Sequence, residues 1–345
     1  MDSEALKFIN HSRTLFIQGD AHQIGFATKE FCFVVRKVAE LFSTPSQAIG
    51  GILLLESAVA KLTEANEGKE EITPVHSDLL QLCILAHFYR GALDYINPDL
   101  SAQFSSDAIS DTESVLSYYY YSGVVFTAMR KYSQAKLHFI ASIVAPAQIV
   151  SAIALEAYKK LILISLIETG TVAPLPKYVS PTISRMLKAL APSYTELVNM
   201  CSTNDLSLIS KFVIENMATF KGNQGLVKRV LAAVNRHNVK RLTKTFMTLS
   251  TAEIAKRCGI QSPAKATDLV LEMIEEGEVT AELNQHDQVV TFKDDPERYD
   301  TTKIASELAS KIRQTVALTS RIREADADIS TSSQYLQKIL GREVP

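Results

Sequence analysis

The sequence predicts a mostly α-helical protein: a solenoid of helical repeats, then a small helix–turn–helix unit with a β-hairpin, then a long C-terminal helix. Three observations lead to this prediction. Apolar residues recur with helical spacing through most of the 345 residues. The chain has only 13 glycines and 11 prolines, too few turn residues for a protein of many short strands. Strict apolar–polar alternation appears clearly only once, near residue 280.

Composition and charge are those of an ordinary globular protein. Hydrophobic residues make up 46% and charged residues 21%, and the length suggests two or three domains. A net charge of -2 gives no general attraction to nucleic acid or membranes. The four cysteines lie far apart and the first residues lack a basic signal region. We therefore expect reduced thiols in a cytoplasmic and nuclear protein.

One charge-free stretch could be mistaken for a membrane span. Residues 137–155 contain no acidic or basic residue and approach the length that crosses a bilayer. Polar side chains interrupt the stretch, however, and Pro146 lies near its middle. The sequence predicts two buried helices that meet at Pro146 and no membrane segment.

Residues 114–146 contain the small and aromatic residues of a tetratricopeptide helix–turn–helix. Gly123 is expected to let the two helices approach closely, and Phe139 to fill the space between successive helix pairs. Because such a unit cannot bury its apolar face alone, similar pairs must stack on it. This predicts a right-handed helical-repeat solenoid over residues 1–220. Polar residues 66–71 and 101–112 are predicted to be exposed loops.

Signals of two short helices follow near residue 250. Ser250 and Glu253 form a capping box that opens the first helix, and Gly259 ends it. The second helix begins with Pro263 at its first position and stops at Gly277.

A β-hairpin completes this unit. Apolar residues alternate over 279–283 and again over 290–292, and residues 284–288 form the turn between them. Two helices followed by a two-stranded wing make a winged-helix domain, which we place at residues 221–299.

The last region, residues 300–345, is predicted to be a bundle helix and a tail. The helix is expected over residues 302–325. Its apolar side chains form a broad stripe, and we expect no folded domain after it that could cover this stripe. The stripe consists of Ile304, Leu308, Ile312, Val316 and Ile322. We expect it to pack with helices of partner proteins, with packing on its own domain as the alternative.

The charge of the second winged-helix helix argues against DNA reading. In a DNA-binding helix–turn–helix this helix enters the major groove and should be cationic. Residues 263–278 hold one cation, Lys265, against five acids that repel phosphate. These acids are Asp268, Glu272, Glu275, Glu276 and Glu278.

A basic segment lies upstream. Residues 216–252 contain no acidic residue, whereas residues 228–244 alone carry six basic side chains. The favoured interpretation is a solvated face or a dock for an acidic neighbour. A nucleic-acid-binding adaptor acting through residues 228–244 is the alternative, although the interleaved aromatics of single-strand binders are missing.

Motifs of an active site are not found. The seven histidines form no H-E-x-x-H or similar metal-binding pair, and no phosphate-binding glycine loop or G-x-S-x-G turn occurs. We therefore expect a protein that is not an enzyme and needs no metal or cofactor. The competing class is a hydrolase, which would predict metal-dependent or thiol-dependent turnover by the isolated chain.

The chain resembles the PCI family, whose members are subunits of the proteasome lid, the signalosome and translation initiation factors. The resemblance rests on Leu249-Ser250, on Met273–Val279 (MIEEGEV), on Leu283-Asn284-Gln285 and on the run 295–299 (DPERY). Further segments are similar to a signalosome subunit. They are Thr73–Cys83, Ala154–Ile167, Gly225–Val230 and Arg241–Ser250.

This resemblance implies a non-catalytic scaffold in a complex that removes a ubiquitin-like modifier from cullin–RING ubiquitin ligases, within ubiquitin-dependent protein degradation. Its partners would be other PCI and metalloprotease-like subunits, and a zinc-bearing sister subunit would supply the chemistry. Winged-helix sheets would associate edge to edge and C-terminal helices would gather in a bundle. A PCI subunit of the proteasome lid or of an initiation factor is the neighbouring alternative. The candidate partner-binding residues, besides the five of the C-terminal stripe, are Leu249, Glu272, Glu276, Val279, Leu283, Val290 and Phe292.

Overall fold

The computed structural model describes residues 3–66, 71–97, 103–104, 111–144, 149–203, 205–260, 262–284, 286–293 and 301–340. The chain forms two compact units, residues 1–293 and 294–345. The predicted Pro146 junction, Gln285 and the run 295–299 lie outside the described residues.

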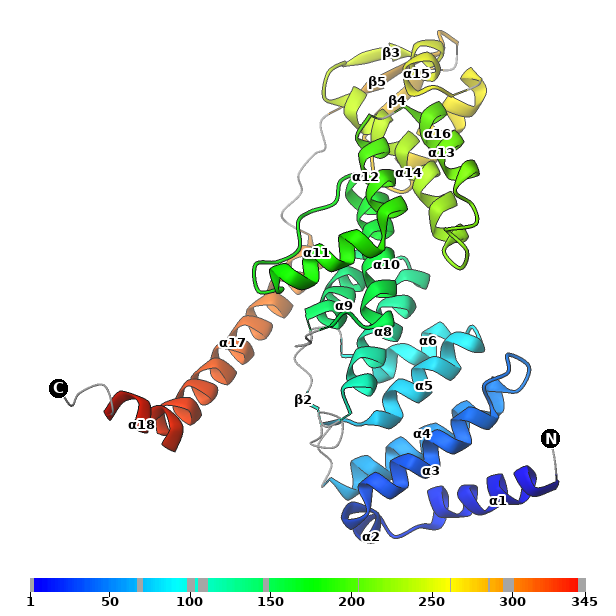
Figure 1. Ribbon diagram of the computed structural model, residues 1–345. Coiled ribbons are helices and arrows are strands. Elements are labelled where there is room, and N and C mark those ends of the chain that lie inside the picture. Colours follow the sequence, from blue (N-terminus) through cyan, green and yellow to red (C-terminus); the bar gives the residue numbers. More distant parts are fainter. Residues whose placement is uncertain are drawn as a thin grey trace. The chain divides into compact units, whose positions relative to one another are not determined.

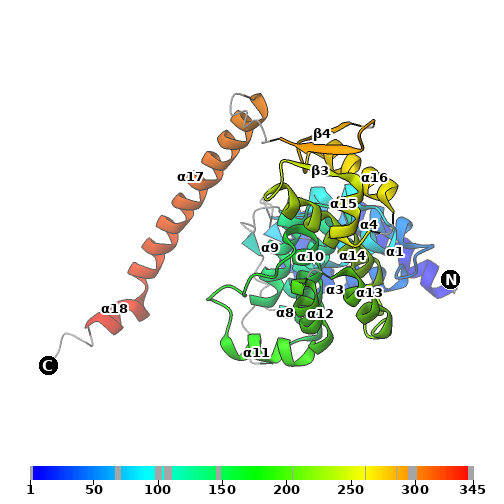
Figure 2. The same ribbon diagram turned by 90° about the horizontal axis from the view of Figure 1, so that it is seen from above.

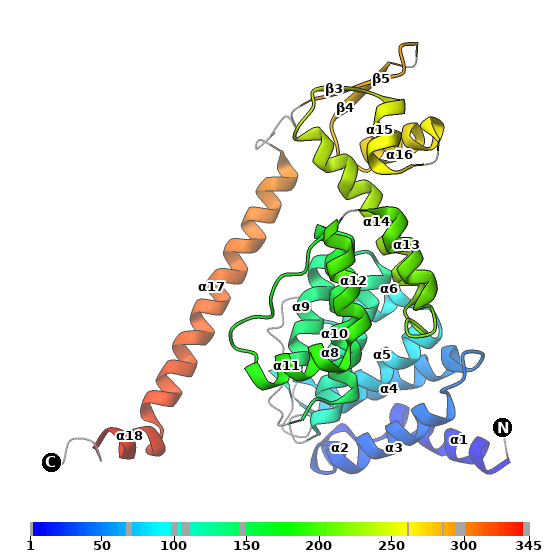
Figure 3. The same ribbon diagram turned by 45° about the horizontal axis from the view of Figure 1, so that its top comes forward.

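The first unit begins with helices that follow one another in chain order, from blue to green in Figures 1 and 3. Its helices are α1 (Ser3–Gln18), α2 (Ala21–Phe26), α3 (Thr28–Leu41), α4 (Ala48–Ala65), α5 (Pro74–Leu85), α6 (Tyr89–Ala92), the 3₁₀ turn η1 (Leu93–Tyr95), α8 (Thr112–Ala128), α9 (Tyr132–Val144), α10 (Ala152–Thr169), α11 (Pro181–Leu190), α12 (Pro192–Thr203), α13 (Leu206–Glu215) and α14 (Gln224–Thr243). The mostly helical fold with N-terminal helical repeats is confirmed.

The predicted repeat at residues 114–146 corresponds to α8 and α9, which pack closely against each other. A Cβ atom on Gly123 would lie 2.7 Å from Cε1 of Phe139, so only glycine fits at this crossing. Phe139 and Ala135 are fully buried, and Phe126 is nearly so. The role expected of Gly123 is therefore confirmed. Phe139 packs against Gly123 and Tyr120 within the α8–α9 pair, and its expected place between successive pairs stays a prediction.

The predicted polar loops contain a pairing that the sequence did not reveal. Strand β1 (Glu71–Ile72) pairs in parallel with β2 (Gln103–Phe104). Ile72 is buried, and the Phe104 ring packs edge-on against Tyr118 at a centroid distance of 5.9 Å. These two apolar residues anchor otherwise polar segments, and two-residue strands are too short to leave a periodic signal.

A capping box with an unusual partner opens α5 just after β1. The Nδ1 atom of His76 accepts a hydrogen bond from the backbone N–H of Thr73 at 3.1 Å, in the place of the usual glutamate or glutamine. Desolvation by burial lowers the pKa of His76 to about 4. The imidazole is therefore neutral at physiological pH and keeps Nδ1 free to accept this bond.

The charge-free stretch 137–155 is divided between α9 and α10, with residues 145–148 outside the described part. None of the described helices has the length and apolar character needed to span a membrane. Within the stretch, Phe139 and Ile143 face the solenoid core, whereas Leu137 and Ile149 are exposed, so the predicted burial is only partly confirmed.

The winged-helix part follows α14, which leads into it in Figure 3. Its elements are β3 (Thr248–Ser250), α15 (Thr251–Cys258), α16 (Pro263–Glu275), β4 (Ala281–Asn284) and β5 (Val289–Phe292). Ser250 accepts from the backbone N–H of Glu253 at 3.2 Å, and Gly259 and Gly277 take the left-handed φ values of 70° and 71° that end each helix. The ends of both helices are thus confirmed. Of the predicted capping box only the Ser250 cap is seen, because the Glu253 carboxylate accepts from Arg257 at 2.9 Å instead.

The sheet lies beside α15 and α16 (Figure 2). It has three strands in the order β3-β5-β4, all antiparallel. Strand β3 adds to the two predicted hairpin strands by pairing Leu249 with Val290. Three residues give too little alternation for detection, and their pairing depends on β5, some 40 residues later.

Two hydrophobic cores hold the first unit together, and α14 belongs to both. Val227, Val230 and Val234 from its first half pack in the large core of the helical repeats. Val239, near its end, packs with Ile254 in the smaller core of the winged-helix part. The predicted boundaries at 220/221 and 299/300 stay predictions.

The second unit consists of α17 (Thr302–Thr331) and α18 (Ser333–Leu340). Thr301 caps α17 by accepting from the backbone N–H of Ile304 at 3.4 Å. The helix continues beyond the expected end at residue 325. No proline or glycine lies between residues 302 and 340, so the sequence contains no strong stop signal there.

The close crossing at Gly123 can be tested by mutation. We expect Gly123→Ala to lower the free energy of unfolding by about 1–2 kcal/mol, because the added methyl overpacks the site against Phe139. Urea unfolding followed by circular dichroism measures this. Gly123→Ala combined with Phe139→Leu should regain part of the loss.

The control is Gly225→Ala. Gly225 is also helical, but a Cβ atom there meets nothing within 4 Å. It should raise the free energy of unfolding by about 0.4–1 kcal/mol, because it restricts the unfolded chain. Equal effects at the two glycines would contradict the packing account.

Candidate subunit-binding surfaces

The acidic helix α16 faces the basic helix α14. Arg236 of α14 donates hydrogen bonds to Glu276 and, at 3.3 Å, to Glu272. Its guanidinium also lies 3.6 Å from Glu278, and Lys240 lies 3.4 Å from the same carboxylate. We call these five residues the α14–α16 clamp. The basic segment was expected to be a solvated face or to bind an acidic neighbour. Part of it binds acidic residues of the same chain.

The clamp also reaches the helical repeats. Arg130, in the turn between α8 and α9, lies 4.0 Å from Glu276. Arg130 takes a φ of 59°, a backbone conformation that the pattern of side chains does not reveal. This contact joins residues about 145 positions apart, and no sequence signal could have identified it.

Protonation states within the clamp follow from its hydrogen bonds. The hydrogen bond from Arg236 holds the pKa of Glu276 below its usual value, and the reciprocal bond from Glu276 raises the pKa of Arg236. Both groups therefore stay charged at neutral pH. A carboxyl group with a lowered pKa adds stability above its ordinary pKa and loses this contribution as the pH falls.

The clamp accounts for only part of the basic segment. Lys228, Arg229 and Lys244 are exposed, and Arg229 forms no ion pair with any other described residue. Arg241 donates to Asn238 at 3.5 Å. Because Arg236 and Lys240 are paired with acids of α16 and of the turn that follows it, the positive field of α14 is weaker than its composition suggests.

The predicted partner-binding residues of the winged-helix part fall into three groups. Glu272 and Glu276 belong to the clamp. Leu249, Val279 and Leu283 are half-buried and pack against the winged-helix core. The remaining two residues, Val290 and Phe292, lie on the central strand β5.

Burial assigns Val290 and Phe292 to the interior. Val290 is 0% exposed and Phe292 is 7% exposed. Their side chains hold the sheet on α15 and α16, so direct contact with a partner does not fit their position. Alternation along the strand correctly placed Val290 and Phe292 on one face of the sheet, and in the structure this face is directed toward the core.

Each outer strand of the sheet has one unpaired edge, because β3 and β4 both pair only with β5 among the described strands. Such an edge presents free N–H and C=O groups that can receive a strand of another chain. The two edges differ in length, since β3 has three residues and β4 has four.

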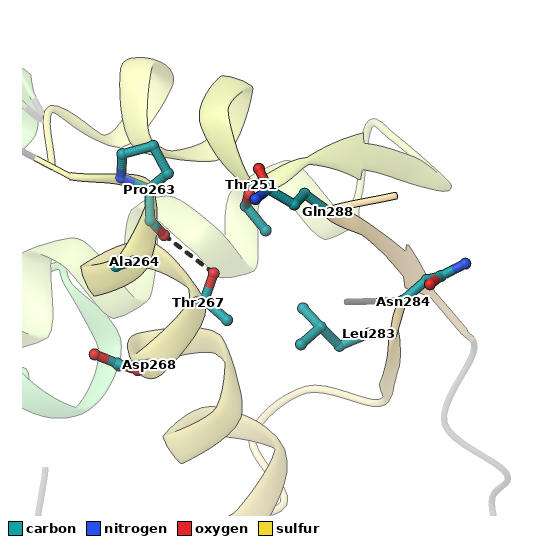
Figure 4. Close-up of a pocket in the computed structure, with 8 residues that line it drawn as sticks. All are labelled: Thr251, Pro263, Ala264, Thr267, Asp268, Leu283, Asn284 and Gln288. Atoms are coloured by element: carbon teal, nitrogen blue, oxygen red, sulfur yellow. Dashed lines mark hydrogen bonds between the residues drawn. The ribbon is translucent and has the colours of Figure 1, made fainter. Parts of the chain in front are cut away.

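A pocket of about 360 Å³ lies between β4 and α16. Leu283 of β4 points toward Thr267 of α16 across this pocket (Figure 4). The Thr267 hydroxyl donates to the carbonyl oxygen of Pro263 at 3.0 Å, which leaves its methyl group for the pocket. Asp268 lies at the rim, with its carboxylate directed away from Leu283. We call this pocket with its rim the α16–β4 groove.

In the second unit, the predicted stripe of α17 is exposed along its length. The exposed fractions are 38% for Ile304, 60% for Leu308, 55% for Ile312, 64% for Val316 and 60% for Ile322. Leu318 and Ile329 extend the same face, and α18 adds exposed Leu336 and Ile339. A continuous apolar face of this length is typical of a helix that packs against partner helices.

Reactive and metal-binding groups do not gather in the described part of the chain. No three histidine, cysteine or acidic side chains among those residues are arranged to hold a metal ion. The four cysteines are buried, and burial raises the pKa of Cys83 to about 12 and of Cys258 to about 11. These thiols are therefore protonated and unreactive at neutral pH.

The clamp predicts a salt-dependent effect of mutating Arg236. Arg236→Ala should lower the free energy of unfolding by about 0.5–1 kcal/mol at low salt, since partly exposed ion pairs contribute little individually. The loss should shrink at high salt, where screening weakens the wild-type pairs, and below about pH 4, where carboxylates are protonated. Thermal and urea unfolding over a salt series measure both effects.

Arg229→Ala provides the matched control, because it removes an exposed arginine of the same helix outside the clamp. It should change the unfolding free energy by less than about 0.5 kcal/mol. If Arg236→Ala and Arg229→Ala had the same effect at every salt concentration, the clamp would not contribute to stability.

Comparisons with known proteins identify both parts of the first unit. Residues 1–183 match the family described as COP9 signalosome complex subunit 3, N-terminal helical repeats. Residues 206–294 match the PCI domain family. The second match covers α13, α14 and the whole winged-helix part, which confirms the resemblance to the PCI family.

Two curated relatives extend the similarity over nearly the whole chain. COP9 signalosome complex subunit 3 of Dictyostelium discoideum is 37% identical over 337 residues, which cover 96% of this chain and 79% of the relative. The protein of the same name from Drosophila melanogaster is 29% identical over 357 residues, covering 99% and 79%. The signalosome resemblance is thereby confirmed: the chain belongs to the COP9 signalosome complex subunit 3 family.

Proposed function

We propose that this chain is a non-catalytic scaffold subunit of a signalosome complex that removes a ubiquitin-like modifier from cullin–RING ubiquitin ligases. Family membership supports the assignment to the complex. The single observation that carries a scaffold role is the exposed apolar face of α17, because a free chain gains nothing from such a face whereas an assembled one buries it.

In this proposal α17 packs in a bundle with helices of other subunits. Its apolar face runs from Ile304 to Ile329 and is broad. A face broader than a strict two-stranded seam suits a helix with more than one neighbour. Polar and charged residues occupy the remaining surface and would face solvent or the rim of the bundle.

The winged-helix part adds a second type of contact. Its β3 and β4 edges can each pair with a strand of a neighbouring subunit, which would join winged-helix sheets edge to edge. Partners would be PCI and metalloprotease-like subunits, and cullin–RING ligases would be engaged by the assembled complex. A zinc-bearing sister subunit would carry the isopeptidase chemistry.

A proteasome-lid or initiation-factor role is less well supported, because both curated relatives reported above are signalosome subunits. The proposed place of action is the nucleus and the cytoplasm. Imaging of the tagged chain at its normal expression level tests this, and confinement to a membrane-bound compartment would contradict it.

Mutation of the α17 face tests the scaffold role. We expect Ile312→Asp with Ile322→Asp to leave the first unit folded but to reduce recovery of other subunits at least tenfold. Two carboxylates in an apolar helix interface would be desolvated without partners. Affinity purification from cells followed by quantitative mass spectrometry measures the recovery.

The control carries the same added charge on the polar side of α17. Ser306→Asp with Ser310→Asp adds the same charge, and neither position lies three or four residues from a side chain of the apolar face. It should assemble as wild type. Normal assembly of the Ile312/Ile322 variant, with intact circular dichroism, would count against the bundle.

The alternative adaptor function predicts binding to nucleic acid through residues 228–244. We expect the purified full chain to cause no mobility shift of duplex DNA or single-stranded RNA, even at low salt, because the α14–α16 clamp neutralises part of this segment. A shift that weakens with salt and disappears in Lys228→Glu with Arg229→Glu would support the adaptor instead.

A further inference from the structure

The connection between α10 and α11, residues 170–180, runs along the outer side of the helices and contains no helix or strand (Figure 3). Gly170 ends α10 with a φ of 72°, and Pro181 opens α11. Two further prolines and a tyrosine lie between these ends. The proposed scaffold contacts do not involve this connection.

The two prolines restrict four consecutive backbone positions. The rings of Pro174 and Pro176 fix φ near about −65°. The residue before each proline, Ala173 or Leu175, is confined to extended or polyproline II conformations. Residues 173–176 therefore favour polyproline II before any partner binds, which reduces the conformational entropy lost on binding.

Burial along the segment follows the period of three residues that polyproline II has. Val172 and Leu175 are half-buried and pack against the core of the helical repeats. Pro174 and Lys177, which share a second edge, are exposed, and Pro176 on the third edge is half-buried. One edge thus holds the segment on the protein, and the other two remain accessible.

A turn after Pro176 exposes Tyr178. The backbone N–H of Val179 donates to the carbonyl oxygen of Pro176 at 3.0 Å. Without this turn, Tyr178 would continue the inward edge of Val172 and Leu175. Instead its side chain is 71% exposed and makes no hydrogen bond or ring contact with any described residue. A tyrosine suits recognition because its ring is apolar and its hydroxyl is polar.

The surroundings of this segment are cationic. Residues 169–195 contain no acidic residue but carry Lys177, Arg185 and Lys188. All three side chains are exposed, and none forms an ion pair with another residue in the part of the chain that the structure describes. A partner with acidic residues around its binding groove would complement this charge.

We propose that residues 173–178 (APLPKY) bind the aromatic-lined groove of a WW-type domain in a further protein. Aromatic side chains of the groove stack on the proline rings, and an adjoining pocket takes Tyr178. Lys177 faces acidic residues at the rim of the groove. The segment brings that protein to the complex, a role that goes beyond the scaffold function and does not depend on it.

The spacing of the prolines selects against other domains that bind polyproline II. SH3 domains read two prolines in the pattern P-x-x-P. Pro174, Pro176 and Pro181 are separated by two and by five positions, so the segment lacks this pattern. A groove that reads one proline and a tyrosine two residues later, as in WW domains, fits Pro176 and Tyr178.

The test titrates the purified full chain into a panel of isotope-labelled WW domains. At least one domain should bind, with NMR shift changes centred on its aromatic groove. Tyr178→Ala and Pro176→Ala should each weaken this binding at least tenfold. Because the Tyr178 side chain is mostly exposed, Tyr178→Ala should keep the wild-type unfolding midpoint, which separates loss of binding from loss of folding.

The matched control is Tyr335→Ala. Tyr335 of α18 is another exposed tyrosine, at 44%, and no proline lies near it in the sequence. This variant should bind the WW domain as wild type does. Equal weakening by Tyr178→Ala and Tyr335→Ala would overturn the proposal. So would the absence of binding to every domain of the panel, or binding that Tyr178→Ala leaves unchanged.

A parallel titration with SH3 domains tests the other class of reader. We expect no binding there. Binding of an SH3 domain that survives Tyr178→Ala and disappears in Lys177→Ala would overturn the proposal, because the segment would then be read through its cation without the tyrosine.

Capture from cells separates this inference from the proposed function. The immobilised WW domain that binds best should capture the wild-type chain together with other subunits. Tyr178→Ala should still assemble but should be lost from the capture at least tenfold. If the scaffold function fails, the chain is captured without other subunits. If only the inference fails, the wild-type chain assembles and is captured no better than Tyr178→Ala.

Discussion

The first unit depends on one continuous helix that serves two hydrophobic cores. The first half of α14 places Val230 in the core of the helical repeats, and its end places Val239 in the core of the winged-helix part. Because an α-helix of 20 residues is stiff, α14 fixes the positions of the two cores relative to each other. The clamp between Arg236 and the acids of α16 adds an electrostatic contact along it. Neither contribution would hold the arrangement if α14 were broken.

This arrangement also determines the electrostatic character of the winged-helix part. A helix–turn–helix is best known as a DNA-reading shape, and α14 alone is basic enough to suggest that use. Folding directs Arg236 and Lys240 toward α16, where acids neutralise them. Asp268 and Glu275 stay exposed on the same face of α16 as Glu272 and form no ion pair with any described residue. The pairing within the clamp thus weakens the nucleic-acid-binding function that α14 alone suggests.

The two proposed contacts of the scaffold, at the α17 face and at the sheet edges, rely on different interactions. The α17 face offers apolar area, which gives affinity without strong selectivity because the hydrophobic effect is not directional. Backbone pairing at a sheet edge gives direction and register. A subunit that combines both contacts can be held tightly and still be placed at one position in an assembly. Buried Val290 and Phe292 contribute to this indirectly, because they keep the sheet on its helices.

By itself, the sequence determined the features that local chemistry controls. Helical periodicity, the N-cap at Ser250, the glycines at 259 and 277, and the close crossing at Gly123 could be predicted because each depends on residues near in the chain or on a repeat pattern. The apolar stripe of α17 was readable for the same reason. Only the tertiary structure decided which charges meet, because the pairing of Arg236 with Glu276 and of β3 with β5 joins residues about 40 positions apart. It also decided that Val290 and Phe292 are interior, since alternation along a strand identifies two faces and folding alone selects the buried one.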